Sequence, residues 1–306
     1  MKVFIPTLFL LIVNIALPCY NVDMGAAVKA FAKLNLTLAI KGVENGFHML
    51  DSLVCTVDIY DSIKLKKRRD KLISIEMHGR GLELLPYENN NAVKAAQAYI
   101  DRFDTCGVDI VIYKNIPVGA GMGGSSADIS GVIRGMNRLY GLGSESELKE
   151  LADGLGSDTG YLLTGGFARL TGRGEKVEPL KVKCKLNALI LVPKGGVCTA
   201  QCYKLYDETE KLKLSSELAL NALFSGHLDW LGANLNNALY PAATLLNPDI
   251  FTAYEELKSF SPLGVNMTGS GSAVFALFES AEMCAYVKSR YRGKFECIQT
   301  KTVVPK

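Results

Sequence analysis

The sequence predicts an α+β fold divided between two domains, on three observations. The chain has 306 residues, and at about 150 residues per domain roughly two domains are expected. Apolar residues make up 48% and charged residues 21%, which is an ordinary globular composition. Strand patterns follow one another as hairpins and are interrupted by helical patterns, instead of alternating regularly with helices. The composition excludes disordered, collagen-like and low-complexity architectures.

Charge and rare residue types narrow the function. The 34 basic residues exceed the 31 acidic ones by three, a surplus too small to indicate a nucleic-acid partner. The basic run at 64–69 carries no interleaved aromatic residues, so we expect it at a turn between strands. Three histidines disfavour a histidine-rich metal centre, and no CxxC pair occurs among the eight cysteines. We therefore expect no metal site built from protein ligands.

Residues 1–23 form an apolar leader. Lys2 precedes the apolar stretch Val3–Leu17, which is shorter than the ~20 residues that a membrane-spanning helix needs. The stretch is similar to a signal-peptide core, although Pro18 makes a poor cleavage site. A third interpretation is translated upstream sequence before a true start at Met24. We expect the working protein to begin near Met24, without stable membrane association.

The periodicity of apolar residues predicts the elements in order. The N-terminal half reads as strands at Val28–Ile40, Leu53–Leu65 and Leu72–Met77, a helix at Asn91–Phe103, a strand at Val108–Tyr113, an amphipathic helix after Gly124, a short helix at Leu148–Leu155 and a strand pair at Tyr161–Thr171. The C-terminal half reads as a strand at Leu186–Val192, helices at Glu217–Phe224 and Asp249–Leu257, and a hairpin at Gly264–Phe278. The two strands that flank the basic run are expected to form a hairpin.

The strongest chemical signal is the glycine-rich segment Pro117–Ser126. Its glycines permit positive φ angles and a close approach of the backbone to a ligand. The helix that follows offers unpaired N–H groups and a positive dipole end, where phosphates bind. The segment lacks the GK[ST] of a Walker A loop and the βαβ context of a dinucleotide fingerprint. The alternative is a glycine-rich turn with a serine cap.

Three further features are compatible with the same site. Thr268–Ser272 is a second glycine-rich segment, which could line the same cleft or form a tight hairpin turn. Asp158 lies between glycines at Gly156 and Gly160, either as a turn or cap residue or as a catalytic carboxylate. Lys33 interrupts an apolar strand, and a lysine is rarely buried without a partner, which Asp158 would supply.

The order of these segments resembles the successive motifs of the GHMP small-molecule kinases. Gly46-Phe47-His48 is similar, more narrowly, to a motif of the 4-diphosphocytidyl-2-C-methyl-D-erythritol kinase family, and the match runs from about residue 28 to about residue 278. The resemblance implies an N-terminal nucleotide-binding domain like ribosomal protein S5 domain 2 at 24–183. It implies a ferredoxin-like C-terminal domain at 184–306, with the active site in the cleft between them.

The resemblance also implies the reaction. It is the ATP- and Mg²⁺-dependent phosphorylation of the 2-hydroxyl of a cytidine-diphosphate-linked methylerythritol, in cytoplasmic non-mevalonate isoprenoid synthesis. Asp158 would be the general base, and Lys33 would keep it ionised. The implied ATP-binding residues are Asn91, Lys114, Pro117, Val118, Gly119, Ala120, Gly121, Met122, Gly123, Gly124, Ser125, Ser126 and Ala127. The implied substrate-binding residues are Asn35, Phe47, His48, Tyr203, Lys204, Thr268, Gly269 and Ser270.

Some of these assignments and alternatives stay open. His48 would read the cytosine edge, and Phe47 and Tyr203 would sandwich the ring; for Tyr203 and Lys204 a core aromatic beside a surface lysine is the other interpretation. Against the family pattern, Ser125 and Ala127 replace a glycine and a serine, and Gly160 replaces a proline. The alternatives are another GHMP kinase of homoserine or mevalonate type, or a catalytically silent nucleotide-binding relative. The oligomeric state is left open.

Overall fold

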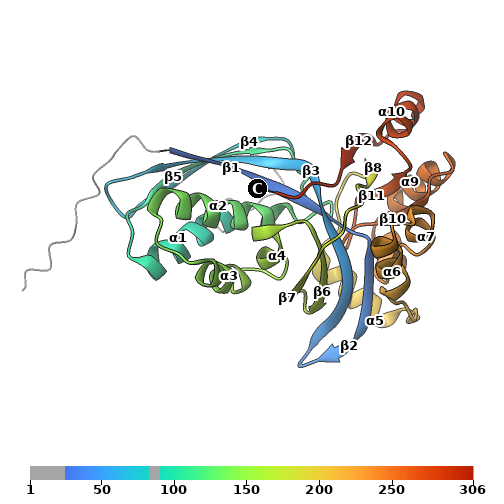
Figure 1. The fold of residues 1–306 in the computed structure, drawn as a ribbon, viewed down its shortest axis with the longest axis horizontal. Helices are drawn as coiled ribbons and strands as arrows, with labels where there is room; N and C mark the ends of the chain where they lie inside the picture. Colours follow the sequence, from blue (N-terminus) through green and yellow to red (C-terminus); the bar gives the residue numbers. More distant parts are fainter. Residues whose placement is uncertain (1–24, 83–89, 306) are drawn as a thin grey trace, which may run out of the picture.

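The computed structural model describes residues 25–82 and 90–305. The leader at 1–23 and the expected start at Met24 lie outside the described residues. The molecule is elongated, with the helices of the N-terminal half gathered at one end and those of the C-terminal half at the other (Figure 1). Within the described segments, no helix is both long and apolar enough to cross a membrane.

The larger sheet has eight strands and is organised around β3. Its strands are β1 Gly25–Asn35, β2 Thr37–Glu44, β3 Phe47–Lys67, β4 Ile73–Gly79, β5 Val108–Lys114, β6 Phe167–Gly172, β7 Lys176–Leu180 and β9 Asn236–Asn237. The first part of β3 pairs with β2 and β6, and its second part with β1 and β5. The β2–β3 hairpin therefore projects away from the rest of the sheet (Figure 1).

The single strand predicted at Val28–Ile40 is in fact two strands. The chain turns at Leu36, whose N–H donates to the Leu53 carbonyl, and β1 and β2 then pair with different parts of β3. Leu34, Leu36 and Leu38 are all buried. Because the apolar pattern continues through the corner, the sequence carries no sign of the break.

The hairpin predicted around the basic run is also wrong. β5 lies between β3 and β4, antiparallel to the first and parallel to the second. Most of the basic run belongs to the end of β3, and Arg68 just beyond it donates to Asp70 and Asp109. Two strands joined by a polar segment look alike in a sequence whether or not a later strand comes between them, so only the tertiary pairing distinguishes the two arrangements.

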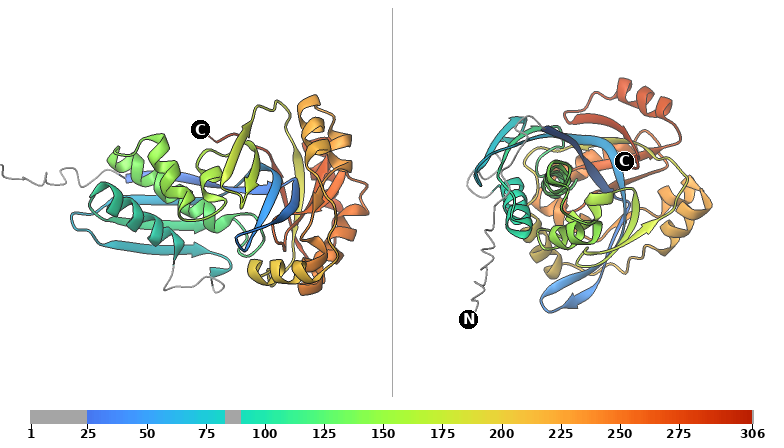
Figure 2. Two further views of the ribbon diagram at one scale, coloured as in Figure 1. Left: turned by 90° about the horizontal axis from the view of Figure 1, so that it is seen from below. Right: turned by 60° about the vertical axis from the view of Figure 1, so that its left-hand side comes forward.

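Four helices of the N-terminal half lie on one face of this sheet (Figures 1 and 2). They are α1 Asn91–Phe103, α2 Gly124–Tyr140, α3 Glu145–Asp153 and α4 Thr159–Thr164. α1 has the predicted bounds, and the Asn90 side chain caps it by accepting from the Ala92 N–H. α3 begins with a capping box of Ser144 and Glu147.

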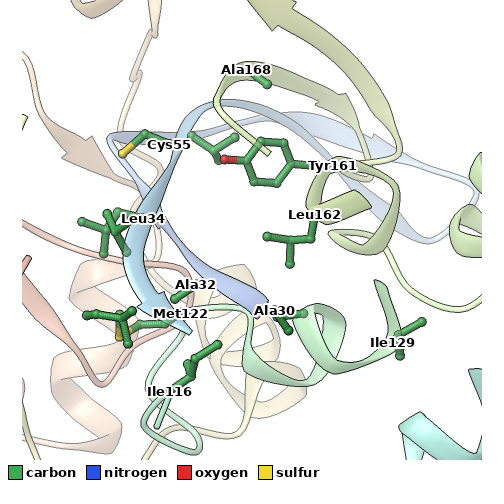
Figure 3. Close-up of a cluster of buried hydrophobic side chains, with 14 of the residues drawn as sticks. Ala30, Ala32, Leu34, Cys55, Ile116, Met122, Ile129, Tyr161, Leu162 and Ala168 are labelled. Atoms are coloured by element: carbon green, nitrogen blue, oxygen red, sulfur yellow. The ribbon is translucent and has the colours of Figure 1, made fainter. Parts of the chain in front are cut away.

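α4 replaces the first half of the strand pair predicted at Tyr161–Thr171. The helix ends at Gly165 and Gly166, whose positive φ angles return the chain to β6. The Tyr161 side chain is buried, and its hydroxyl donates to the Gly166 carbonyl, which fixes the short helix against the sheet (Figure 3). A short apolar run does not by itself distinguish a helix from a strand.

The second sheet has the antiparallel order β10-β11-β8-β12. Its strands are β8 Asn187–Val192, β10 Gly264–Met267, β11 Val274–Phe278 and β12 Glu296–Lys301. The helices of this half are α5 Thr199–Glu208, α6 Glu217–Ser225, α7 Leu228–Ala233, α8 Tyr240–Leu246, α9 Asp249–Lys258 and α10 Ala281–Arg290. The chain order and the sheet order match the ferredoxin-like arrangement, with extra helices between β8 and β10. The predicted hairpin at Gly264–Phe278 is confirmed.

The two halves share a hydrophobic core. One cluster of buried side chains, part of which Figure 3 shows, extends from Leu34 and Tyr161 in the N-terminal half to Ile190 and Phe275 in the C-terminal half. Beyond β12 the chain returns to the first sheet, where Thr302 forms an isolated bridge with Val57. The site described next lies where the two halves meet.

Candidate active site

The glycine-rich segment leads from β5 into the N-terminus of α2. Gly119, Gly121 and Gly123 have φ angles of +70°, +74° and +75°. Gly123 is the N-cap residue of α2, and no side chain caps the helix there. Among the described residues, the first N–H groups of α2 thus have no side-chain acceptor, which is the usual state of a helix end that binds phosphate.

The second glycine-rich segment lies directly against the first. Thr268 Oγ1 donates to the Gly121 carbonyl at 3.3 Å, and the Ala273 N–H donates to the Ala120 carbonyl at 3.1 Å. A Cβ atom on Gly121 would clash with the Thr268 carbonyl oxygen. The hairpin between β10 and β11 thus packs against the first glycine-rich segment from the C-terminal half, so the two glycine-rich segments are in direct contact.

A cavity of about 270 Å³ opens beside α2. Its lining consists of Met77, Asn90, Asn91, Ala92, Lys114, Ile116, Pro117, Val118, Gly119, Ala120, Gly121, Met122, Gly123, Gly124, Ser125, Ser126 and Asp128. Of the residues expected to bind ATP, only Ala127 is absent from this lining; it lies in the first turn of α2 and is buried. The cavity therefore brings the expected nucleotide-binding residues together.

Lys114 lies at the base of this cavity in a buried cluster that the sequence did not reveal. Its ammonium group contacts carboxylate oxygens of both Asp61 and Asp128. The other oxygen of Asp61 accepts from the backbone N–H groups of Asn115 and Ile116, so this aspartate also holds the start of the glycine-rich segment. Burial raises the pKa of Asp128 to about 7, and the neighbouring Asp61 adds to that shift while Lys114 opposes it.

Lys33 and Asp158 meet at the Gly123 end of the segment. The Lys33 ammonium lies 3.3 Å from Asp158 Oδ2, and the Lys33 backbone N–H donates to the Met122 carbonyl. Lys33 is 4% exposed, whereas the side chain of Asp158 is 28% exposed. Asp158 is the N-cap residue of α4 but makes no cap hydrogen bond. The carboxylate is thus paired with the lysine and open to a ligand.

Asn35 joins this pair to the second glycine-rich segment. Its side-chain oxygen accepts from the Lys33 ammonium and from the Gly269 N–H, and its side-chain nitrogen donates to Ser52. Ser270 is hydrogen-bonded instead to Thr199 at the start of α5, at 2.9 Å. The Asn35 side chain therefore holds Lys33 in its position and is already hydrogen-bonded at both of its polar atoms.

His48 lies apart from these groups, where β3 passes α5. Its ring centroid is 4.7 Å from that of Tyr203, and its Nε2 is 2.8 Å from Asp207 Oδ1. Asp207 follows Tyr203 by one helical turn, a spacing that could have identified it from the sequence. Lys204, between them, is exposed.

Phe47 occupies the opposite face of the strand from His48, as successive residues of a strand do. Its ring is 52% exposed, and the guanidinium of Arg173 lies over it at 4.7 Å. The described side chains do not hold Phe47 and Tyr203 on two sides of one space. The predicted cytosine sandwich stays a prediction.

Two departures from the family pattern have a local explanation. Ser125 is exposed and its hydroxyl accepts from the Asn91 side chain at 2.7 Å, so the added side chain points along the cavity wall. A Cβ atom on Gly160 would clash with the carboxylate of Asp153, which is paired with Lys149. Glycine at 160 is thus required by the position of that aspartate.

The arrangement is suited to phosphoryl transfer. Phosphates held at the N-terminus of α2 would lie next to a carboxylate that is paired with a buried lysine, and positioning and charge stabilisation supply most of the catalysis in this chemistry. Together with the two sheets, this site defines the class of the protein as a GHMP-type small-molecule kinase.

Comparison with known proteins gives the particular family. Residues 90–168 match the family described as GHMP kinases N terminal domain, and residues 219–292 match GHMP kinases C terminal. A 4-diphosphocytidyl-2-C-methyl-D-erythritol kinase of Caldicellulosiruptor saccharolyticus is 37% identical over 256 residues, covering 82% of this chain and 87% of the relative. The chain belongs to the 4-diphosphocytidyl-2-C-methyl-D-erythritol kinase family of GHMP kinases.

Solved structures agree with this assignment. The crystal structure of a 4-(cytidine 5'-diphospho)-2C-methyl-D-erythritol kinase superposes with a TM-score of 0.75 at 29% identity, covering 91% of this chain and all of that one. A homoserine kinase from Cytophaga hutchinsonii superposes at 0.66 with 21% identity, covering 91% and 95%, and shows the shared fold alone. The resemblance and the α+β two-domain fold expected from the sequence are therefore confirmed.

Proposed function

We propose that this chain transfers the γ-phosphoryl group of ATP to the 2-hydroxyl of 4-diphosphocytidyl-2-C-methyl-D-erythritol, a step in the non-mevalonate synthesis of isoprenoid precursors. Family membership supports the substrate. The observation that carries the reaction is the ion pair of Lys33 and Asp158 beside the phosphate-binding segment. No comparable pairing would be needed in a protein that only held a nucleotide.

In the proposed mechanism Asp158 is the general base. The Lys33 ammonium lies 3.3 Å from the carboxylate and holds it beside the glycine-rich segment. As the hydroxyl oxygen attacks, its proton passes to Asp158. Lys33 then offsets the negative charge that develops on the transferring group, while Asn35 keeps the lysine from moving away.

ATP would lie in the cavity beside α2, with its phosphates against the backbone N–H groups that follow Gly123. We propose that it enters as its Mg²⁺ complex, since Mg²⁺ at such sites is held largely by substrate phosphates. Among residues 25–82 and 90–305, no group of three or more His, Cys, Asp or Glu side chains could hold a metal ion. Bound Mg²⁺ would neutralise charge on the phosphates.

The cytidine end of the substrate is assigned to His48. With Nε2 engaged by Asp207, Nδ1 is the ring nitrogen left for a ligand. Tyr203 supports the imidazole face at 4.7 Å and restricts its orientation. We also propose that Lys204 reaches the substrate from α5, and that Thr268, Gly269 and Ser270 act as the far wall of the site.

Two further expectations belong to this proposal. A cytoplasmic location would follow from the need for ATP. A division into domains at 24–183 and 184–306 would fall in the segment between β7 and β8, with the last residues returning to the first domain through Thr302.

The test follows ADP release from Mg-ATP with 4-diphosphocytidyl-2-C-methyl-D-erythritol, with homoserine and mevalonate run in parallel. We expect turnover with the cytidine substrate alone. Turnover confined to homoserine or mevalonate would identify a different GHMP kinase. Measurable ATP binding with no turnover on any of the three would identify a silent relative.

A further inference from the structure

A second cavity, of about 480 Å³, opens further along α2 and shares no lining residue with the cavity beside the glycine-rich segment. It lies where α2, α3 and α4 meet, helices that Figure 1 shows packed together on one face of the sheet. Its volume is within the usual range of small-molecule sites. The proposed function leaves this cavity without a role.

Two arginines of α2 give this cavity its charge. Arg134 and Arg138 both line it, and because they are four residues apart they lie on the same face of the helix. The other polar lining residues, Asn137 and Thr164, are uncharged. Within the described part of the chain, no acidic side chain lines the cavity, and the ion pairs of arginines all involve other arginines. These residues therefore do not neutralise the two positive charges.

Both guanidiniums are anchored to strand β1 and keep N–H groups for a ligand. Arg134 Nη2 donates to the Lys29 carbonyl at 2.7 Å, and Arg138 Nη1 donates to the Ala27 carbonyl at 2.8 Å. With the residues that the structure describes they form no other hydrogen bond, and Arg134 Nε is buried without an acceptor, which is uncommon in a folded protein. Each guanidinium is thus held in position while its other terminal nitrogen, Nη1 of Arg134 and Nη2 of Arg138, stays unengaged.

The arginine pair is electrostatically unfavourable by itself. Like charges four residues apart on a helix repel each other. Burial lowers the pKa of Arg134 to about 10, and the charge of Arg138 contributes to the same shift. An anion between the two guanidiniums would offset both effects, because it supplies the opposite charge and the missing hydrogen-bond acceptors together.

The rest of the cavity wall is largely apolar. Leu148 from α3, Leu163 from α4 and Pro305 from the C-terminal segment line it. All three side chains are half-buried, so each retains apolar surface that a ligand could cover. Covering such surface is favourable in proportion to its area. The wall therefore suits a ligand that carries a short hydrocarbon group beside its negative charge.

We propose that this cavity binds a small organic phosphate, with the phosphate on Arg134 and Arg138 and a short hydrocarbon group on the apolar wall. Planar guanidinium donors match phosphate oxygens in geometry and in charge. A phosphate monoester carries close to two negative charges at neutral pH, so it balances both arginines, which a single carboxylate does not. No residue of the proposed active site lines this cavity, and the inference is independent of the proposed function.

The experiment measures the affinity of the full chain for butyl phosphate and for inorganic phosphate by calorimetry. A saturating non-hydrolysable ATP analogue with Mg²⁺ is present, so that neither probe occupies the N-terminus of α2. The variants are Arg134→Gln and Arg138→Gln. The matched control is Arg290→Gln, which removes an exposed arginine of α10, at the other end of the molecule (Figure 1).

We expect the wild type to bind butyl phosphate about fivefold or more tightly than inorganic phosphate, because the apolar wall buries hydrocarbon. Arg134→Gln and Arg138→Gln should each weaken butyl phosphate binding about tenfold or more, because hydrogen bonds between charged groups are lost. Arg290→Gln should match the wild type. Unchanged affinity for the ATP analogue shows that a variant is folded, and Arg138→Gln, at an exposed position, provides the test if Arg134→Gln folds poorly.

Several results would contradict the inference. Equal butyl phosphate affinities in the wild type and Arg138→Gln would overturn the site, and so would a wild type that binds neither probe. An equal loss of affinity in Arg290→Gln would show a general effect of net charge and would overturn it as well. Equal affinities of the wild type for the two probes would overturn the organic part of the ligand. The kinase assay bears on the proposed function alone, so the two proposals can fail separately.

Discussion

A lysine inside an apolar strand led to its ion pair with Asp158. Lys33 is a charged residue in an otherwise apolar strand, and this alone predicted a carboxylate partner. The structure supplies Asp158, together with an Asn35 side chain that the sequence connected to substrate rather than to the lysine. Single residues of unusual type can thus be recognised in a sequence, whereas their hydrogen-bond partners cannot.

Removing the carboxylate of Asp158 should separate chemistry from binding. Asp158→Asn is expected to lower kcat about 10²–10⁴-fold, the range that a general base contributes, because the amide cannot accept the hydroxyl proton. ATP affinity should change little, since Asp158 does not line the nucleotide cavity. ADP release and calorimetric ATP titration measure the two effects. Asp229→Asn, an exposed change in α7, is the control, and near-normal turnover in Asp158→Asn would mean that another group is the base.

Asp128 should make stability depend on pH. Its pKa is raised to about 7 chiefly by burial, whereas in the unfolded chain it titrates near ~4, so the native state binds the extra proton between these values. The contribution of this group to the free energy of unfolding therefore falls as pH rises through that window, and is constant above it. The amide in Asp128→Asn does not titrate, so the free energy of unfolding of this variant does not carry this decrease. Relative to the wild type, the free energy of unfolding of the variant should therefore rise by on the order of 1–3 kcal/mol from pH 4.5 to 7.5.

Urea unfolding at several pH values measures this difference. Asp104→Asn is the matched control, because Asp104 is exposed, has its pKa lowered by a hydrogen bond from Lys71, and occupies a left-handed conformation that asparagine tolerates. The free energy of unfolding of Asp104→Asn should not rise relative to that of the wild type as the pH rises. Parallel pH curves for Asp128→Asn and the wild type would show that Asp128 keeps an ordinary pKa.

At the scale of elements, the site depends on two glycine-rich segments that come from different sheets. The sequence predicts that the first binds phosphate, because glycines before a helix let the backbone N–H groups of the helix end approach an anion. The second was ambiguous, since a β-hairpin turn needs the same glycines. The structure shows the hairpin turn, and the contact of Thr268 with Gly121, between residues almost 150 positions apart, places this turn against the first segment.

Gly121→Ala should weaken both the fold and the nucleotide site. A left-handed conformation costs a non-glycine residue about 1–3 kcal/mol, and the new Cβ would also press on the Thr268 carbonyl. Gly141→Ala is the matched control, because Gly141 has a φ of +70° at the end of α2 and nothing within 4 Å of the added atom. Both variants should lose stability in urea, and only Gly121→Ala should lose ATP affinity in calorimetric titration. Equal ATP affinities would mean that the contact with Thr268 does not shape the site.

At the scale of the whole molecule, the two halves are joined by more than a linker. The buried cluster of Leu34, Tyr161, Ile190 and Phe275 runs through both sheets, and β9 from the C-terminal half pairs with β2. The chain divides into two sheets by topology, but its apolar core is shared. Separate unfolding of either half would expose this core to water.

The protein should therefore unfold in a single transition. Scanning calorimetry is expected to give a calorimetric enthalpy within about 10% of the van't Hoff enthalpy, as for a cooperative unit. Saturating Mg-ATP should raise the midpoint without splitting the peak, because the ligand binds only the native state. Two resolved peaks would show that the halves are independent folding units.

The sequence by itself determined the family, the helix at Asn91–Phe103, the glycine-rich segment before α2 and the pairing of Lys33 with Asp158, because each depends on residue type and local order. Only the tertiary structure decided that β5 lies between β3 and β4, that Lys114 is buried between Asp61 and Asp128, and that Arg173 stacks on Phe47. These contacts join residues between 14 and 126 positions apart. Side chains so distant in sequence meet only through strand pairing and the packing of helices on the sheet, and no local pattern records such pairings.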